Sequence, residues 1–151
     1  MTMKIALGSD HGGVALKQVL IQFLQERDIE VADAGTNSDE SVDYPDFGER
    51  VALLVVHGEA DAGIVVCGTG IGISIAANKV PGIRAALVTS PEMARLAKEH
   101  NNANVLALGG RILDDATATA CVAAWLDASF EGGRHQRRLD RITALEEKSC
   151  R

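Results

Sequence analysis

Residues 62–79, AGIVVCGTGIGISIAANK, run from an apolar segment through a loop rich in glycine and on into a second apolar segment. The first part predicts a buried strand over residues 62–66, and the last part predicts a helix that reaches residue 79. Gly68, Gly70 and Gly72 permit positive φ angles and close backbone approach, so successive N–H groups can converge on an anion. The stretch is therefore a strand that turns, at an anion-binding loop, into a helix.

The same alternation of strand and helix continues on both sides of this stretch. Further strands are predicted over residues 4–7, 29–34, 83–88 and 104–108. Further helices are predicted over residues 12–27, 46–57, 91–100 and 114–128, with a polar loop at 35–44 and a charged final helix from Gly133. Strands that alternate with helices imply right-handed crossovers and a parallel sheet covered on both faces. The sequence predicts a single domain over residues 1–151, a three-layer α/β/α sandwich with a five-stranded, Rossmann-like parallel sheet.

Composition excludes several classes of function. Apolar residues make up 46% of the chain but aromatic residues only 3%, so few rings are available to stack on nucleobases. A formal net charge of −6 argues against nucleic-acid and anionic-membrane partners. No apolar run approaches the roughly 20 residues that cross a bilayer, and the N-terminus does not resemble a signal peptide. We expect a cytoplasmic protein whose three cysteines are reduced.

Ligands of parallel α/β sheets bind beyond the carboxyl ends of the strands, near the point where the strand order reverses. Four polar segments follow predicted strands, and we expect them to gather at that edge. They are residues 8–13, the loop after Cys67, residues 89–90 and residues 109–111.

Cys67 stands where the third strand ends, beside the start of a helix, and this environment favours a thiolate. It can serve as a base or a nucleophile; the alternative is a small apolar residue that fills space at a strand end. The loop after it lacks the third glycine of a dinucleotide fingerprint, because residue 73 is Ile73, and it lacks the lysine of a P-loop. Its glycines can also serve only to turn the chain. Cys121 is expected in the core.

The histidines and arginines supply further candidates. His11 and His100 lie where functional side chains collect, although His100 also fits a helix C-terminus, as His57 does. No histidine pair has metal-ligand spacing, so no metal is expected. A basic cluster opens the last helix, and a phosphate or a partner carboxylate would account for it, the alternative being a solvated face. If that helix leaves the domain, it can carry the cluster to a neighbouring subunit.

Together these stretches resemble one family, the type B ribose-5-phosphate isomerases and their relatives, the allose- and galactose-6-phosphate isomerases. The matching stretches are GSDHGG (8–13), DYPDF (43–47), CGTGIGISIAANK (67–79), GIRAAL (82–87), HNNANVLALGGR (100–111) and FEGGRHQRR (130–138). They follow one another in order along nearly the whole chain.

The resemblance implies an aldose–ketose isomerase that uses neither metal nor cofactor. It implies that Cys67 moves a proton through an enediolate, that the N–H groups of Gly68, Gly70 and Gly72 hold the oxyanion, and that His100 opens the sugar ring. The remaining implied roles are assistance by Thr69 and Asp10, phosphate binding by His11, Arg111, Arg134, His135 and Arg138, and sugar contacts by Tyr44 and Asn101. Family sites combine two subunits, so a homodimer or a dimer of dimers is expected, with the last helix packed on the partner.

The resemblance leaves the substrate open. The stretch GISIAANK favours the ribose 5-phosphate branch, while allose 6-phosphate, galactose 6-phosphate and a tetrulose phosphate are the alternatives. Two other classes of protein also fit the residues. One is a module that binds a phosphate ligand without turning it over, and the other is a structural oligomer whose arginines bind partner carboxylates.

Overall fold

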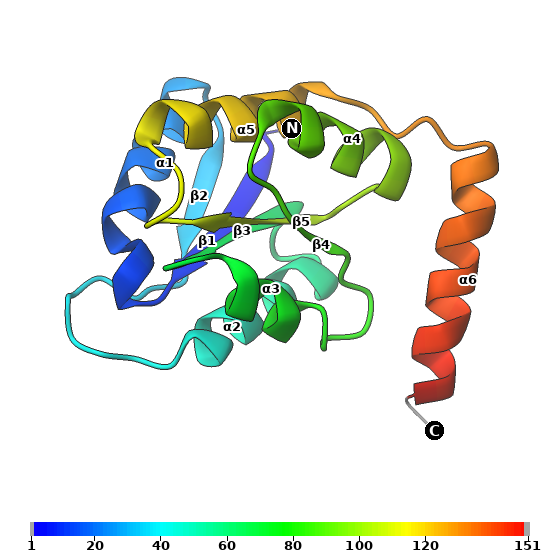
Figure 1. The fold of residues 1–151 in the computed structure, drawn as a ribbon, viewed down its shortest axis with the longest axis horizontal. Helices are drawn as coiled ribbons and strands as arrows, with labels where there is room; N and C mark the ends of the chain where they lie inside the picture. Colours follow the sequence, from blue (N-terminus) through cyan, green and yellow to red (C-terminus); the bar gives the residue numbers. More distant parts are fainter. Residues whose placement is uncertain (1, 150–151) are drawn as a thin grey trace.

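The computed structural model describes residues 2–149 and contains one sheet with helices on both of its faces (Figure 1). The strands are β1 (Lys4–Ser9), β2 (Glu30–Asp33), β3 (Ala62–Cys67), β4 (Ala85–Leu87) and β5 (Val105–Gly109). The helices are α1 (Val14–Glu26), α2 (Tyr44–Val56), α3 (Ile71–Ala77), α4 (Pro91–Asn101), α5 (Asp115–Asp127) and α6 (Arg134–Ser149). The strand order is β2-β1-β3-β5-β4 and every neighbouring pair is parallel, which confirms the predicted fold class.

Alternation along the strands divides the core into two layers. Ile5 and Leu7 pack with α1, α4 and α5 on one face, whereas Ala6 packs with α2 and α3 on the other. Trp125 of α5 is fully buried, and its indole N–H donates to the Ala103 carbonyl at 2.9 Å. Because the polar end of this ring is satisfied, it packs in the core at no hydrogen-bonding cost.

Local signals in the sequence account for where the helices begin and end. The Ser90 hydroxyl accepts from the Met93 N–H and Pro91 follows it, a combination that is typical of a helix start. The Asp114 carboxylate accepts from the Thr117 N–H, and hydrogen bonds with Thr117 lower the pKa of this carboxyl. Asn102, with φ of 45°, ends α4 in the left-handed conformation.

Some predicted boundaries were wrong. The helix expected from residue 12 begins at Val14, because Asp10 first caps a single 3₁₀ turn at His11–Gly13. Tyr44, expected at the end of a loop, lies in the first turn of α2. The fourth strand and the helix after the glycine loop are shorter than expected. In these last two cases the apolar pattern continues into turns that lie outside the element.

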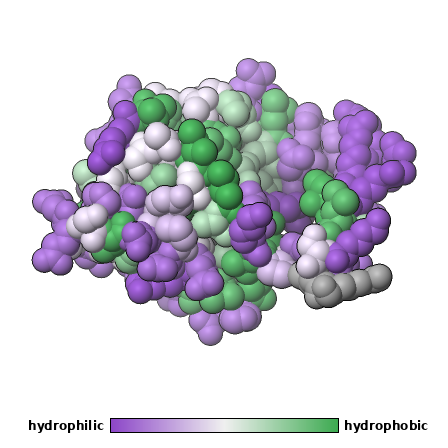
Figure 2. Space-filling model, turned by 60° about the horizontal axis from the view of Figure 1, so that its bottom comes forward, coloured by the Kyte–Doolittle hydropathy of each residue, from purple (hydrophilic) through white to green (hydrophobic). Residues whose placement is uncertain are grey.

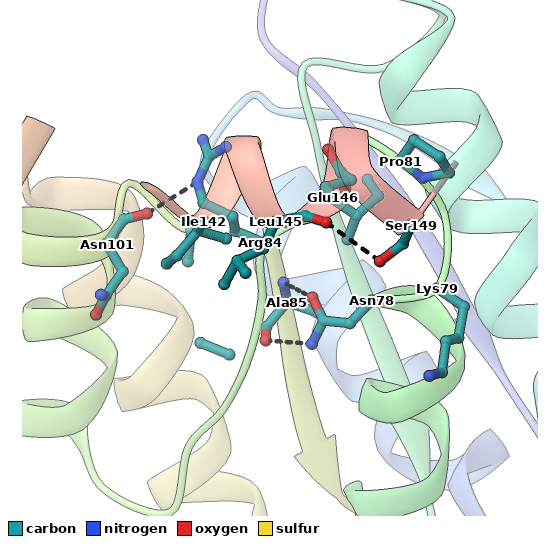
Figure 3. A pocket seen from close by; sticks show the side chains of 13 residues that line it. Asn78, Lys79, Pro81, Arg84, Ala85, Asn101, Ile142, Leu145, Glu146 and Ser149 are labelled. Carbon is teal, nitrogen blue, oxygen red and sulfur yellow. Dashed lines mark hydrogen bonds between the residues drawn. The ribbon is translucent and has the colours of Figure 1, made fainter. Parts of the chain in front are cut away.

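Helix α6 stands away from the rest of the domain, and its main contact with another helix is with α4 (Figure 1). Within it only His135 and Leu139 are buried, while Ile142 is 48% and Leu145 63% exposed. These two side chains line a groove of ≈ 670 Å³ together with Asn78 and Arg84 (Figure 3). Figure 2 shows apolar patches in green, both on the main body of the domain and on the lobe at the right of the picture.

Among residues 2–149, no helix combines the length and apolar character that a membrane crossing requires.

Candidate active site

The strand order reverses between β1 and β3, and the carboxyl ends of these strands carry the first group of predicted residues. Asp10 follows β1 and its N–H donates to the Val66 carbonyl of β3 at 3.1 Å. The loop after β5 is joined to the same place, since the Gly110 N–H donates to the Cys67 carbonyl at 2.8 Å. Three loops therefore meet at the switch point of the sheet, where ligands of such folds bind.

Cys67 is the last residue of β3, and its side chain faces the glycine loop. The residue is 4% exposed, and its sulfur accepts a hydrogen bond from the Gly70 N–H at 3.1 Å. Cys121 lies instead among core residues, and burial raises the pKa of its thiol. Of these two cysteines, only Cys67 is placed for chemistry.

Two glycines of the loop, Gly70 and Gly72, are required by its geometry. Gly70 has φ of 80°, and a side chain there would lie 2.8 Å from the backbone carbon of Leu108. A Cβ on Gly72 would lie 2.5 Å from the ring of Tyr44. Within residues 2–149 the N–H groups of Gly68, Thr69 and Gly72 donate to no protein acceptor, so they are available to a ligand. The loop thus turns the chain and also offers free donors.

Asp10 and His11 lie beside this loop. The Cβ position of Gly12 is 3.3 Å from both a carboxylate oxygen of Asp10 and the Gly68 nitrogen, which places the carboxylate near the loop. His11 accepts a hydrogen bond at Nδ1 from the Val42 N–H at 3.2 Å. Its other nitrogen, Nε2, therefore carries the proton of the neutral ring and can donate to a ligand.

Arg111 and Tyr44 complete the first group. The Arg111 guanidinium lies over the loop, with Nη1 3.2 Å from the Cβ position of Gly68, and it forms no ion pair within residues 2–149. The Tyr44 ring covers Gly72 and is 40% exposed. A cation and a phenol thus border the free N–H groups, an arrangement suited to a phosphorylated polar ligand.

His100 and Asn101 lie at the opposite edge of the sheet. Helix α4 runs back from the carboxyl end of β4, and the carbonyls of Asn101 and Asn102 accept from the Arg84 guanidinium at 3.0 and 2.9 Å. Arg84 directly precedes β4, so the end of α4 is at the amino edge, about one strand length or roughly 15 Å from Cys67. Within one chain, His100 and Asn101 therefore lie apart from the first group.

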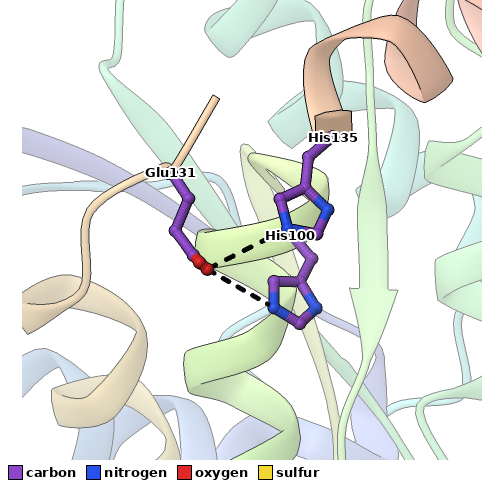
Figure 4. A group of neighbouring side chains, drawn as sticks. All are labelled: His100, Glu131 and His135. Atoms are coloured by element: carbon purple, nitrogen blue, oxygen red, sulfur yellow. Dashed lines mark ion pairs between the residues drawn. The ribbon is translucent and has the colours of Figure 1, made fainter. Parts of the chain in front are cut away.

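A second group forms around His100 at that edge (Figure 4). The His100 and His135 rings are stacked, with centroids 4.2 Å apart and planes 13° apart. Glu131 Oε1 lies 3.6 Å from His100 Nε2 and 3.9 Å from His135 Nε2. Burial is the main cause that lowers the pKa of His135, with further lowering by His100, Arg134 and Arg138 against the effect of Glu131. Arg134 and Arg138 lie on α6 and are exposed.

The family model described as Ribose/Galactose Isomerase matches residues 5–142. The chain belongs to the ribose/galactose isomerase family. It is 52% identical to ribose-5-phosphate isomerase B of Escherichia coli, over 96% of this chain and 97% of that protein. The structure of Clostridium thermocellum ribose-5-phosphate isomerase B has a TM-score of 0.97 and 57% identity, and covers 97% of this chain and 99% of that one. The structure of Mycoplasma genitalium ribose-5-phosphate isomerase B with bound ribulose 5-phosphate has a TM-score of 0.92 and 46% identity. It covers 97% of this chain and 98% of that one.

In this member of the ribose/galactose isomerase family, the second group does not form a ready cation site. Its three ligand atoms lie within 4.8 Å of one another. A metal ion binds in the plane of an imidazole, however, and two rings stacked 13° apart cannot both contain one ion in their planes. Two neighbouring arginines also oppose a cation. The arrangement is better suited to proton transfer or to anion binding.

Sequence reasoning missed two residues of this isomerase. Glu131 is part of FEGGRH, and its spacing of four residues from His135 was the available signal. Lys17 is fully buried, and its ammonium donates to Asp33 and Asn37, each at 2.6 Å. It anchors the start of the loop that leads to Tyr44. A lysine in an amphipathic helix pattern gives no sign that it will be buried and paired.

Proposed function

We propose that the protein interconverts D-ribose 5-phosphate and D-ribulose 5-phosphate through an enediolate, with Cys67 as the base. The observation that carries this proposal is the hydrogen bond from the Gly70 N–H to the Cys67 sulfur. It lies in a loop in which other N–H groups, among residues 2–149, donate to no protein acceptor. Base and oxyanion site must adjoin, because the proton leaves the carbon next to the carbonyl. Relatives named ribose-5-phosphate isomerase B, similar over nearly their whole length, support the choice of substrate.

In this mechanism the Cys67 thiolate takes the proton from C2 of the open-chain aldose, and O1 becomes the enediolate oxygen. The N–H groups of the loop stabilise the negative charge on that oxygen. The thiol then returns the proton to C1, and the hydroxyl proton of O2 moves to O1, which yields the ketose. Asp10, next to the loop, and Thr69, within it, assist the proton transfer between the oxygens. Atoms and electrons balance within the substrate, so the reaction needs no cofactor.

The complete site requires a second copy of the chain. His100, Asn101 and the basic residues of α6 lie across the sheet from Cys67, so one chain supplies them to the site of its partner. The exposed Ile142 and Leu145, beside a groove lined by both apolar and polar residues, support the packing of a partner against α6. The assembly is a homodimer or a dimer of dimers, since a two-fold contact gives both copies the same completed site.

The phosphate is bound by His11 and Arg111 of one copy and by Arg134, His135 and Arg138 of the other. Arg138→Ala is expected to raise the dissociation constant of a phosphorylated sugar acid about 10- to 100-fold, the effect of losing a charge-assisted hydrogen bond. Calorimetric titration measures this constant. Arg141→Ala, three residues further along the same exposed helix, is the matched control and should bind normally. Unchanged binding by the Arg138 variant would remove this residue from the phosphate site.

The substrate is tested by initial rates with four-, five- and six-carbon sugar phosphates, each with and without a chelator. We expect the five-carbon pair to be converted fastest, at a rate that the chelator leaves unchanged. Faster conversion of a six-carbon or tetrulose phosphate would assign the protein to another branch of the family. Binding without any turnover or solvent hydrogen exchange would instead indicate a phosphate-binding module.

A further inference from the structure

We propose that Glu131 is a positioning residue for His100: its carboxylate, together with the stacked ring of His135, holds the His100 imidazole with Nε2 protonated and Nδ1 free to open the sugar ring. This inference rests on the proposed function, in which His100 opens the ring. It adds the residue that orients His100 and the nitrogen that acts.

The first support is the way in which Glu131 is fixed. Its backbone N–H donates to the Glu99 carbonyl in the last turn of α4 at 3.0 Å, so Glu131 is tied to the residue that precedes His100. Gly132 and Gly133 follow with φ of 68° and 55°, and this left-handed pair turns the chain into α6. The turn brings His135 back onto the His100 ring. Glu131 and His135 therefore reach His100 as one connected unit.

The second support is the environment of the two rings. Glu131 Oε1 lies 3.6 Å from His100 Nε2, and within residues 2–149 the Nδ1 atom of His100 forms no hydrogen bond. His135 is 5% exposed, and its buried Nε2 has no hydrogen-bond partner within the same residues. Burial and the neighbouring His100, Arg134 and Arg138 lower the pKa of His135 despite the opposing effect of Glu131. Because a neutral His135 does not pair with the Glu131 carboxylate, the negative charge of that carboxylate is available to His100.

These contacts define a proton path for ring opening. His100 Nδ1 takes the proton of the O1 hydroxyl, the C1–O4 bond breaks as the C1=O1 bond forms, and the proton is delivered to O4. During the step the ring is an imidazolium, and the Glu131 carboxylate balances its charge, as carboxylates do for histidine bases in other enzymes. Glu131 does not touch the sugar, so it acts only through His100.

The two substrates separate this step from the isomerisation. Ribose 5-phosphate is a furanose in solution and must be opened. Ribulose 5-phosphate is acyclic, because its O5 carries the phosphate and cannot close a ring on C2. A variant defective only in ring opening is therefore slow with ribose 5-phosphate, yet it still exchanges the C1 hydrogen of ribulose 5-phosphate with solvent.

The experiment uses the full-length Glu131→Gln protein. Its kcat with ribose 5-phosphate is expected to fall at least about tenfold, which is less than the 10²–10⁴ that a general acid–base group itself contributes, because Glu131 acts only through His100. Its rate of deuterium exchange at C1 of ribulose 5-phosphate, followed by NMR in D₂O, is expected to stay within about twofold of wild type. The matched control is Glu99→Gln, because Glu99 pairs with Arg95 at 2.6 Å outside the cluster and loses the same charge.

The possible outcomes are distinct. Equal losses in both assays would overturn the inference, since they would mean that Glu131 serves the fold or the phosphate site. No loss in either assay, while His100→Asn still slows only the ribose 5-phosphate reaction, would overturn it too and leave the proposed function intact. Absence of turnover by the wild-type protein would instead refute the proposed function.

Discussion

Cys67→Ala is expected to lower kcat for the interconversion of ribose 5-phosphate and ribulose 5-phosphate by about 10²–10⁴, the usual contribution of a positioned proton-transfer group. Alanine keeps the β-carbon and removes the sulfur that accepts the Gly70 N–H, so proton transfer stops while the loop keeps its donors. Initial rates in both directions measure the effect. The exchange of the C1 hydrogen with solvent should fall by the same factor, because the same atom carries that proton.

Cys121→Ala is the matched control for this experiment. Cys121 is also a buried cysteine, but it lies among core residues on α5, and burial raises the pKa of its thiol. We expect this variant to lose at most about 1 kcal/mol of stability and to keep its turnover. A Cys67→Ala protein that folds, oligomerises and turns over at an undiminished rate would sink the assignment of Cys67 as base.

Mixing two inactive variants is expected to restore activity. If each site takes Cys67 from one copy and His100 from the other, then a dimer of one Cys67→Ala chain and one His100→Asn chain has one site with both defects and one intact site. Random pairing makes half of the dimers mixed, so the mixture should recover about one quarter of wild-type activity with ribose 5-phosphate. The gain over either variant alone is large because both start near zero.

The experiment needs subunits that exchange, which a reversible denaturation step or co-expression provides. A mixture of Cys67→Ala with Asp10→Asn, two changes that we place on the same side of the site, is the control and should recover nothing comparable. Failure of the Cys67 and His100 variants to restore activity, with mixed dimers shown by mass spectrometry, would mean that each site lies within one chain.

Local patterns were enough to predict the fold and half of the site. The apolar strand at residues 62–66, and the strands and helices that alternate on both sides of it, predicted a parallel sheet. Chain order alone placed Cys67, Asp10 and Arg111 at the carboxyl edge of this sheet. This works because parallel strands all end at the same edge, whatever their order. The Ser90 cap and the left-handed Gly70 follow from rules that involve only neighbouring residues.

The rule for strand ends does not apply to His100, because a crossover helix runs back to the amino edge of the sheet. A residue at the end of α4 therefore lies about a strand length away from Cys67. The contact of Glu131 with His100, like the pairing of Lys17 with Asp33, joins side chains brought together by chain turns rather than by a periodic pattern.

The sequence by itself thus determined a five-stranded α/β sheet with a thiol beside a glycine loop, because strand pattern, helix period and turn glycines are local properties. Only the tertiary structure decided that the thiol is hydrogen-bonded to Gly70, that His100, Glu131 and His135 form a second group at the other edge, and that α6 stands apart from the body. Those features depend on the direction of helices across the sheet and on packing between residues far apart in the chain.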